Sequence, residues 1–210
     1  MIDLYTWTTP NGRKASIALS EMNMRYQVHP IDINQGDQFN PDFLRISPNN
    51  KIPAIVDQEN GMRLMESGAI LIYLAEKSGM FLPSSGERRI RTIEWLMWQM
   101  GGVGPMLGQL HHFMHYNKGR VPYAEERYHT ETLRLYSVLD RRLADHEFVA
   151  DEYSIADMAI WPWIARYEWH EIEWSDFPHI KRWYKEIAKR PAVVTGYMQP
   201  RNVGEIPIPD

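Results

Sequence analysis

The sequence predicts a small α+β domain at residues 1–80 and an all-α domain at residues 87–200. Three observations support this division. In the first domain the hydrophobic pattern changes several times between the short period of strands and the longer period of helices. Residues 81–86 (Phe-Leu-Pro-Ser-Ser-Gly) have the composition of a linker. Beyond them the apolar positions follow helical spacing alone, which predicts about five helices.

The first domain is predicted to begin with a strand, a helix and a second strand. Residues 2–5 are short and strand-like, and residues 8–12 have the composition of a turn. Apolar side chains at helical spacing then predict a helix with one buried face, made of Ala15, Ile17, Ala18, Leu19 and Met22. Residues 26–31 predict the second strand, with Pro30 favouring an edge. This order implies a right-handed crossover and a parallel strand pair.

The same domain is predicted to end with a hairpin and a helix. After a polar loop, residues 52–56 read as a third strand. Asn60-Gly61 is a strong hairpin turn signal. Residues 63–65 then return antiparallel, and a helix over residues 68–77 completes the order βαβ–ββα.

The second domain is predicted to be helical throughout. A long helix over residues 87–116 is interrupted by a cluster of helix-breaking residues, Gly101, Gly102, Gly104 and Pro105. A second helix is predicted over residues 123–142 and another over residues 177–190. Between them, Ser154 and Asp157 have the spacing of a capping box, with Asp in place of the usual Glu or Gln, and so have a structural role.

The 210 residues include no cysteine, and 23 basic residues stand against 27 acidic ones, for a net charge of −4. The lack of cysteine excludes disulfides, thiolate metal sites and a nucleophilic protein thiol. The mild acidity argues against nucleic acid as the main partner, because phosphate binding depends on basic patches. No segment resembles a signal peptide or a membrane span. We therefore expect a soluble cytoplasmic protein with no membrane partner.

Three histidines raise the question of a metal site. His111 and His115 are four residues apart and share a helix face, with His112 beside them. Catalytic and structural zinc sites need three or four converging ligands, and this spacing supplies no third one. We therefore expect no metal, and instead a polar cluster at a helix end or at a second substrate site.

The loop at residues 8–12 is a candidate thiol site. It lies between the end of a predicted parallel strand and the start of a helix, where unpaired N–H groups and the positive end of the helix dipole favour an anion. Thr9 supplies a hydroxyl and Asn11 an amide that can donate hydrogen bonds to a thiolate. The alternative is a helix N-cap that satisfies only its own backbone, a role that Thr and Asn also favour.

Two further segments can hold a peptide. Ile52-Pro53 opens a strand and is a candidate cis bond, which would present the backbone of Ile52 to an extended ligand; the alternative is an ordinary trans proline. Glu66 and Ser67 stand at a predicted helix N-terminus. There the N–H groups and the Ser67 hydroxyl can hold a carboxylate, and Glu66 can hold an ammonium ion. That combination fits an α-amino acid head group, and a plain helix cap is the alternative.

Taken in order, these segments resemble the cytosolic glutathione transferases, which join a thioredoxin-like N-terminal domain to a helical C-terminal domain. The segments that match the family are residues 49–54 (Asn-Asn-Lys-Ile-Pro-Ala), 66–70 (Glu-Ser-Gly-Ala-Ile) and 154–157 (Ser-Ile-Ala-Asp). A narrower branch, the nu-class bacterial enzymes related to the yeast nitrogen-catabolite regulator, is similar in residues 9–14, 101–106, 111–113 and 161–163. The resemblance covers nearly the whole chain.

The resemblance implies that glutathione is the cosubstrate and that it lies along the thioredoxin-like domain. Glu66 and Ser67 would hold its γ-glutamyl end, and the backbone of Ile52 would pair with its cysteinyl residue. Gln38 and Lys51 would lie near its glycine carboxylate.

The similarity to the nu class implies the activity as well: reduction of small disulfides with two glutathiones, without a catalytic Tyr, Ser or Cys. Thr9 and Asn11 match the residues that contact the thiols in that class, and Arg127 matches a position associated with the second glutathione. Two alternatives stay open, a transferase that conjugates glutathione to electrophiles and a regulatory binding protein of the same fold. A homodimer is also implied, with the helix at residues 87–116 in the interface.

Overall fold

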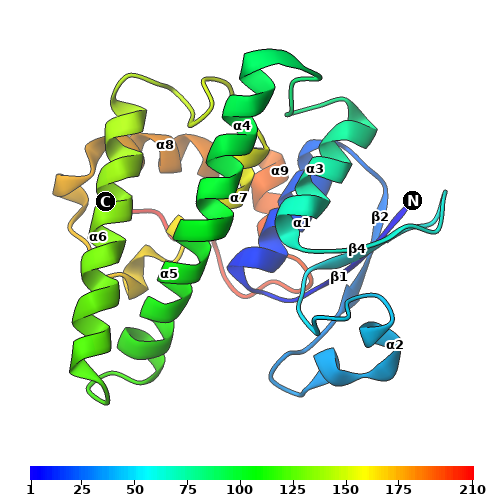
Figure 1. The fold of residues 1–210 in the computed structure, drawn as a ribbon, viewed down its shortest axis with the longest axis horizontal. Coiled ribbons are helices and arrows are strands. Elements are labelled where there is room, and N and C mark those ends of the chain that lie inside the picture. Colours follow the sequence, from blue (N-terminus) through cyan, green and yellow to red (C-terminus); the bar gives the residue numbers. More distant parts are fainter. The chain divides into compact units, whose positions relative to one another are not determined.

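The computed structural model describes the whole chain, residues 1–210, as two compact units (Figure 1). Met1–Ser84 and Ala188–Ile206 form the first unit, and Ser85–Ile187 and Pro207–Asp210 form the second. The first unit contains the sheet and the second is helical, so the predicted combination of an α+β domain and an all-α domain is confirmed. None of the helices is long and apolar enough to cross a membrane.

The first unit is built on a four-stranded sheet with the strand order β2-β1-β3-β4. Its strands are β1 (Ile2–Thr6), β2 (Tyr26–Pro30), β3 (Ala54–Asp57) and β4 (Arg63–Met65). β1 runs parallel to β2, with Leu4 opposite Val28, and antiparallel to β3, which forms a hairpin with β4. The predicted parallel pair and hairpin are therefore confirmed. Leu4 and Ile55 are fully buried, because β1 and β3 are the central strands.

Helices complete the first unit. The longer ones are α1 (Pro10–Glu21), α3 (Ser67–Ser78) and α9 (Pro191–Tyr197), and α1 packs against both of the others. The connection from β2 to β3 contains two short turns, η1 (Asp37–Phe39) and α2 (Pro41–Leu44). α1 follows directly from the end of the central strand β1, so its N-terminus lies at the C-terminal edge of the parallel strand pair.

α9 joins the C-terminal part of the chain to this unit. A Cβ at Gly196 would lie 2.6 Å from the backbone nitrogen of Ile17, so only glycine permits this close packing of α9 on α1. The hydroxyl of Ser16 donates to the Gly196 carbonyl over 2.7 Å. The compact units therefore differ from the expected helical domain at residues 87–200, because residues 188–200 pack with the sheet. Periodicity identifies a helix but does not say which element it packs against.

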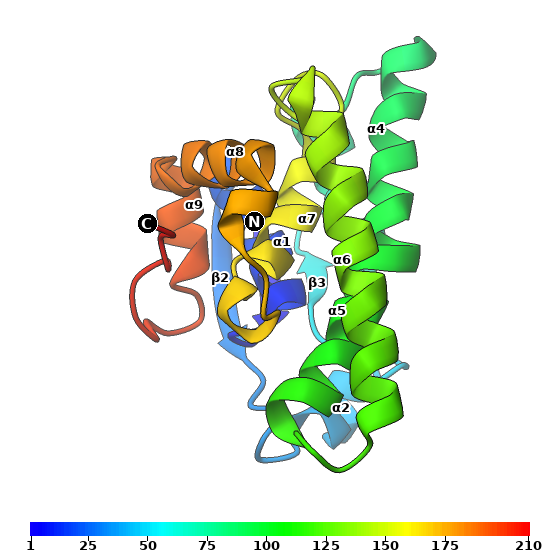
Figure 2. The same cartoon turned by 90° about the vertical axis from the view of Figure 1, so that its left-hand side faces the viewer.

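The second unit contains five α-helices joined by π-helical and 3₁₀ turns (Figure 2). The helices are α4 (Gly86–Trp98), α5 (Gly104–Leu110), α6 (Pro122–Ala144), α7 (Ile155–Ile164) and α8 (Pro178–Ala188). The π turns are η2 (Gln99–Val103) and η3 (His111–Tyr116), and the 3₁₀ turns are η4 (Tyr167–Trp169) and η5 (Trp174–Asp176). α7 packs against α4 and α5.

The glycine-rich segment of the long helix is a π-helical turn. The predicted interruption falls on η2, and the chain continues from it directly into α5 (Figure 1). Pro105 has no N–H group, and its ring would clash with the carbonyl four residues earlier in a regular α-helix. The wider π turn accommodates the proline. A Cβ at Gly104 would lie 2.8 Å from Nε2 of Gln99, so glycine also gives this buried amide its space.

The predicted capping box at the start of α7 is confirmed. Ser154 Oγ accepts from the N–H of Ala156 over 3.2 Å, and Asp157 Oδ2 accepts from the N–H of Ser154 over 3.0 Å. The fully buried Asp157 also accepts from the N–H of Val149 (3.1 Å) and from Nε1 of Trp183 (2.9 Å). Since every residue of α7 is buried, this cap fixes the start of the central helix of the unit.

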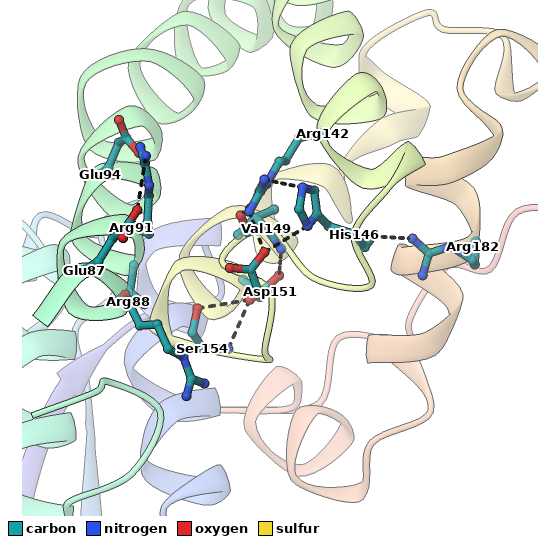
Figure 3. Close-up of polar contacts among 12 residues, drawn as sticks. Glu87, Arg88, Arg91, Glu94, Arg142, His146, Val149, Asp151, Ser154 and Arg182 are labelled. Carbon is teal, nitrogen blue, oxygen red and sulfur yellow. Dashed lines mark hydrogen bonds and ion pairs between the residues drawn. The ribbon is translucent and has the colours of Figure 1, made fainter.

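Side chains from α6 and α8 hold the loop that leads into α7 (Figure 3). Arg142 donates through Nε to the carbonyl of Val149 and through Nη2 to Asp151, each over 2.9 Å. His146 contacts the same Asp151 carboxylate through Nδ1 at 2.9 Å and contacts Arg142 through Nε2. Arg182 donates to the carbonyl of His146 over 2.9 Å. The loop is thereby tied to two helices before the capping box begins.

Replacing Ser154 by alanine is expected to lower the free energy of unfolding by about 1–2 kcal/mol, the usual cost of losing an N-cap. Asp157→Ala is expected to cost more, because it leaves buried N–H donors without an acceptor. Urea denaturation measures both changes. Ser175→Ala is the matched control, since Ser175 is exposed. A Ser154→Ala variant as stable as the Ser175→Ala variant would contradict the role of the cap.

Candidate functional site

Thr9 caps α1 at the edge of the sheet. Its backbone is extended, and Oγ1 accepts from the N–H of Gly12 over 3.1 Å. Because that oxygen accepts, the Thr9 hydroxyl proton can be donated to a ligand. Pro10 occupies the first helical position, where no N–H is needed, and Asn11 follows in the same turn. The backbone fold is tight: a Cβ at Gly12 would lie 2.2 Å from the carbonyl oxygen of Trp7.

The predicted donors Thr9 and Asn11 therefore share the first turn of α1, and both are half-buried. The turn combines the positive end of the helix dipole with side-chain donors, an arrangement that stabilises a thiolate and lowers the pKa of a thiol. The cap function of Thr9, offered by the sequence as an alternative, is also present. The two functions are compatible, because the cap uses the oxygen and the thiolate would use the proton.

The peptide bond between Ile52 and Pro53 is cis. It immediately precedes β3, and Ile52 is half-buried while Lys51 is exposed. The carbonyl of Lys51 accepts a hydrogen bond from Oγ of Ser47 over 2.8 Å, which ties the segment to the end of the loop before it. The sequence left this bond open between cis and trans, and the structure has it cis.

Glu66 and Ser67 lie at the N-terminus of α3, as predicted. Glu66 precedes the helix with a positive φ of 69°, and Ser67 is its first residue. Ser67 is buried, and its Oγ lies 3.3 Å from Nζ of Lys14 on α1. The packing of α1 on α3 brings these side chains together.

Lys14 is the site residue that sequence reasoning missed. It is 1% exposed, and burial lowers the pKa of its ammonium group to about 7, while the nearby Glu66 acts in the opposite direction. A signal for it exists in the sequence, because Lys14 is three residues before Ile17 and four before Ala18, on the predicted buried face of the helix. A lysine is rarely fully buried on such a face unless its charge is paired.

Gln38 and Arg127 belong to other elements than these residues. Gln38 lies in η1, and its Nε2 donates to the carbonyl of Ile33 over 3.3 Å, so its amide is directed to its own loop. Arg127 is exposed on α6, in the second unit, where it lines a cavity of about 600 Å³ together with Tyr123 and Tyr128. The other predicted glutathione contacts all lie in the first unit.

The histidines of the second unit form a hydrogen-bonded chain. His111 Nε2 lies 2.8 Å from Nε2 of His170, whose Nδ1 lies 2.6 Å from the hydroxyl of Tyr136. Burial lowers the pKa of His111 to about 4 and that of His170 well below its usual value. His115 instead stacks on Trp169, with ring centroids 4.0 Å apart. His111 therefore lies at the C-terminal end of α5 and is buried in the core.

No group of three or more histidine, cysteine, aspartate or glutamate side chains is placed to hold a metal ion. Two of the three histidines considered above, His111 and His115, are engaged with different partners in spite of their four-residue spacing.

Comparison with protein families gives two matches. The model described as glutathione S-transferase, N-terminal domain, matches residues 1–76, and the model described as glutathione S-transferase, C-terminal domain, matches residues 109–191. Among curated proteins, the disulfide-bond oxidoreductase YfcG of Escherichia coli (strain K12) is 50% identical over 198 residues, covering 91% of this chain and 92% of the relative.

Two solved structures are similar over nearly their full length. A glutathione transferase family member from Pseudomonas fluorescens Pf-5, with two glutathione bound, has a TM-score of 0.89 and 44% identity, covering 93% of this chain and 92% of that one. A glutathione transferase from Pseudomonas putida, with one glutathione disulfide bound per subunit, has a TM-score of 0.89 and 42% identity, covering 95% and 91%.

Proposed function

Because this chain belongs to the glutathione S-transferase family, we propose that it is a glutathione-dependent disulfide-bond oxidoreductase. One observation carries the proposal: half of its residues are identical, over nearly the whole length of both chains, to a disulfide-bond oxidoreductase. Two similar proteins hold two glutathiones or one glutathione disulfide, which are the reactants and the product of such chemistry. The chain has no cysteine, so both reacting thiols are brought by the ligand.

The proposed binding mode uses the first unit. The N-terminus of α3, with Glu66 and Ser67, holds the γ-glutamyl end of glutathione, since N–H groups there attract a carboxylate. The Ile52 backbone beside the cis bond pairs with the cysteinyl residue. Lys51 is exposed and provides a charge for the glycine carboxylate, and Gln38 would have to turn from its own loop to join it.

The proposed reaction is thiol–disulfide exchange. A glutathione thiolate attacks one sulfur of the substrate disulfide, forms a mixed disulfide and releases the other substrate sulfur as a thiolate, which takes up a proton. The second glutathione, as its thiolate, then attacks the glutathione sulfur of the mixed disulfide. The substrate leaves fully reduced, and glutathione disulfide stays in the site. Thr9 and Asn11 donate hydrogen bonds to the attacking thiolate, and Arg127 contacts the second glutathione.

The proposal extends to assembly and location. α4 exposes the apolar side chains of Ile90 and Met97, which are seven residues apart and so share a helix face. We propose that this face lies in a homodimer interface. A cytoplasmic location is consistent with the need for glutathione, whose reducing pool is cytosolic.

Two measurements test the function. The protein is expected to reduce hydroxyethyl disulfide with glutathione and to show only weak turnover with an aromatic chloro-nitro electrophile. Titration is expected to count two glutathiones, or one glutathione disulfide, per subunit. One bound glutathione under all conditions would exclude the two-thiol mechanism. Strong conjugation of the electrophile with little disulfide reduction would favour the transferase, and binding with neither turnover would favour a regulatory protein.

A further inference from the structure

The cavity of about 600 Å³ in the second unit is lined mainly by one face of α6. Four of its side chains stand at positions i, i+3, i+4 and i+7, which lie together on a helix: Tyr123, Glu126, Arg127 and Thr130. Met106 of α5 lines it as well. Ligand sites commonly have volumes of this size, so the cavity has room for an amino acid and part of the molecule that carries it.

Two opposite charges of this cavity have no partner within the chain. Glu126 and Arg127 are exposed, and the side chain of neither makes a hydrogen bond or an ion pair. The other charged residue of the lining, Glu131, is engaged, since its two oxygens accept from Nε and Nη2 of Arg134 over 2.7 Å. Arg134 thereby holds the pKa of Glu131 below its usual value, and Arg127 adds a weaker electrostatic effect. The cavity therefore offers a ligand one free acid and one free base.

We propose that this cavity binds an α-amino acid head group, with Glu126 as the specificity-determining residue that holds its ammonium ion. Arg127 holds the carboxylate, in keeping with the contact already proposed for it. A ligand that carries only a negative charge is repelled by Glu126, and one that carries only a positive charge is repelled by Arg127. Adjacent opposite charges thus select the zwitterion. This inference rests on the proposed function and adds to it a residue and a ligand class.

The tyrosines of the cavity support a binding role. Tyr123 is 75% exposed and has no hydrogen bond or aromatic contact within the chain. Tyr128 is held in place by stacking on Phe113, with ring centroids 5.6 Å apart. Tyrosine and arginine are among the residue types that contribute most to binding when a partner covers them. These rings would pack against the part of the ligand beyond its head group.

Two molecules of the proposed reaction can bring such a head group. One is the second glutathione, through its γ-glutamyl residue. The other is the substrate disulfide, when it is built from an amino acid, as cystine is. Hydroxyethyl disulfide carries neither charge. A comparison of cystine with hydroxyethyl disulfide in the same variant therefore distinguishes the two sources.

Steady-state kinetics of Glu126→Gln test the assignment. If the second glutathione binds here, the variant raises KM for glutathione about tenfold with either disulfide, because a hydrogen bond between charged groups is lost. If the substrate binds here, the variant lowers kcat/KM for cystine about tenfold and leaves the reaction of hydroxyethyl disulfide native. Glu126→Asp keeps the charge and should retain most of the native value in both cases. Glu168→Gln is the matched control, since Glu168 is an exposed acid of the same unit outside the cavity.

Calorimetric titration tests the cavity without turnover. Glutathione disulfide or cystine, according to the source, should bind Glu126→Gln about tenfold more weakly than it binds the native protein. Equal kinetic constants and equal affinities for both ligands in Glu126→Gln and Glu168→Gln would overturn the assignment, as would a Glu126→Asp variant as impaired as Glu126→Gln. A native protein that reduces neither disulfide would overturn the proposed function instead, so the two failures are distinguishable. Circular dichroism confirms that each variant is folded.

Discussion

Replacing Asn11 by alanine is expected to lower kcat/KM for glutathione-dependent reduction of hydroxyethyl disulfide by about a hundredfold. Asn11 lies in the first turn of α1, which Thr9 caps, and no protein thiol can take over the chemistry. Removing a single preorganised hydrogen-bond donor to a developing or reacting anion typically lowers the rate about a hundredfold or more. Steady-state kinetics at saturating glutathione measures the change.

Binding separates the role of Asn11 in chemistry from a role in structure. The Asn11→Ala variant is expected to bind S-methylglutathione with nearly native affinity, because that ligand has no thiolate to stabilise. Asn34→Ala is the matched control, since Asn34 is an exposed asparagine of the same unit, and it should keep native activity. Native turnover in the Asn11→Ala variant would show that Asn11 does not act on the thiolate.

Acidification is expected to destabilise the protein through the buried histidine pair. The folded-state pKa of His111 is about 4, below the usual value of about 6.5 in an unfolded chain. Between these pKa values the unfolded state binds more protons than the folded state, so the free energy of unfolding rises with pH. The stabilisation that neutral His111 provides is therefore lost as the pH falls from about 6.5 to 4. For His111 alone, the resulting change in the free energy of unfolding is about 3 kcal/mol. His170, whose pKa is lowered too, acts in the same direction.

One other buried group titrates in this range with the opposite sign. Burial raises the pKa of Asp157 to about 6, so its contribution is present at low pH and is lost as the pH rises through 6. Four hydrogen bonds to its carboxylate, including those from Val149 and Trp183, oppose this shift. The two histidines make the free energy of unfolding rise with pH, and the single carboxyl makes it fall. The net effect is therefore a rise of stability with pH.

Urea denaturation from pH 4 to pH 7 measures this dependence, and the slope of stability against pH is the quantity to compare. His111→Gln is expected to reduce the slope by the share of one histidine, because His170 remains buried and acts in the same direction. His112→Gln is the control, because His112 is the next residue along the chain and is exposed. Parallel curves for the native and His111→Gln proteins would contradict the assignment to His111.

The fold was predictable where its determinants are local. The Asn60-Gly61 turn signal and the Ser154–Asp157 spacing each act within a few residues, and each predicted the right element. Packing of α9 on the sheet unit was not predictable in this way. It depends on a contact between Gly196 and Ile17, which are far apart in the chain.

The same distinction between local and long-range determinants applies to the candidate site. Helix N-termini and the Ile52-Pro53 dipeptide can be read from short segments, because caps and X-Pro bonds are local features. Lys14 and Ser67 lie on different helices and are 53 residues apart in the sequence, and His111 and His170 are 59 residues apart. Such partners are set by tertiary packing, which hydrophobic periodicity does not specify.

The packing of α9 on α1 also affects the order in which the two units can fold during synthesis. Translation proceeds from the N-terminus, and domains generally fold as they emerge from the ribosome. The sheet unit lacks α9, and with it the ion pair of Glu21 with Arg190, until nearly the whole chain has been synthesised. The helical unit, apart from its last four residues, is fully synthesised by residue 187. Apart from those four residues, the helical unit is therefore completed before the sheet unit, although the sheet unit begins first.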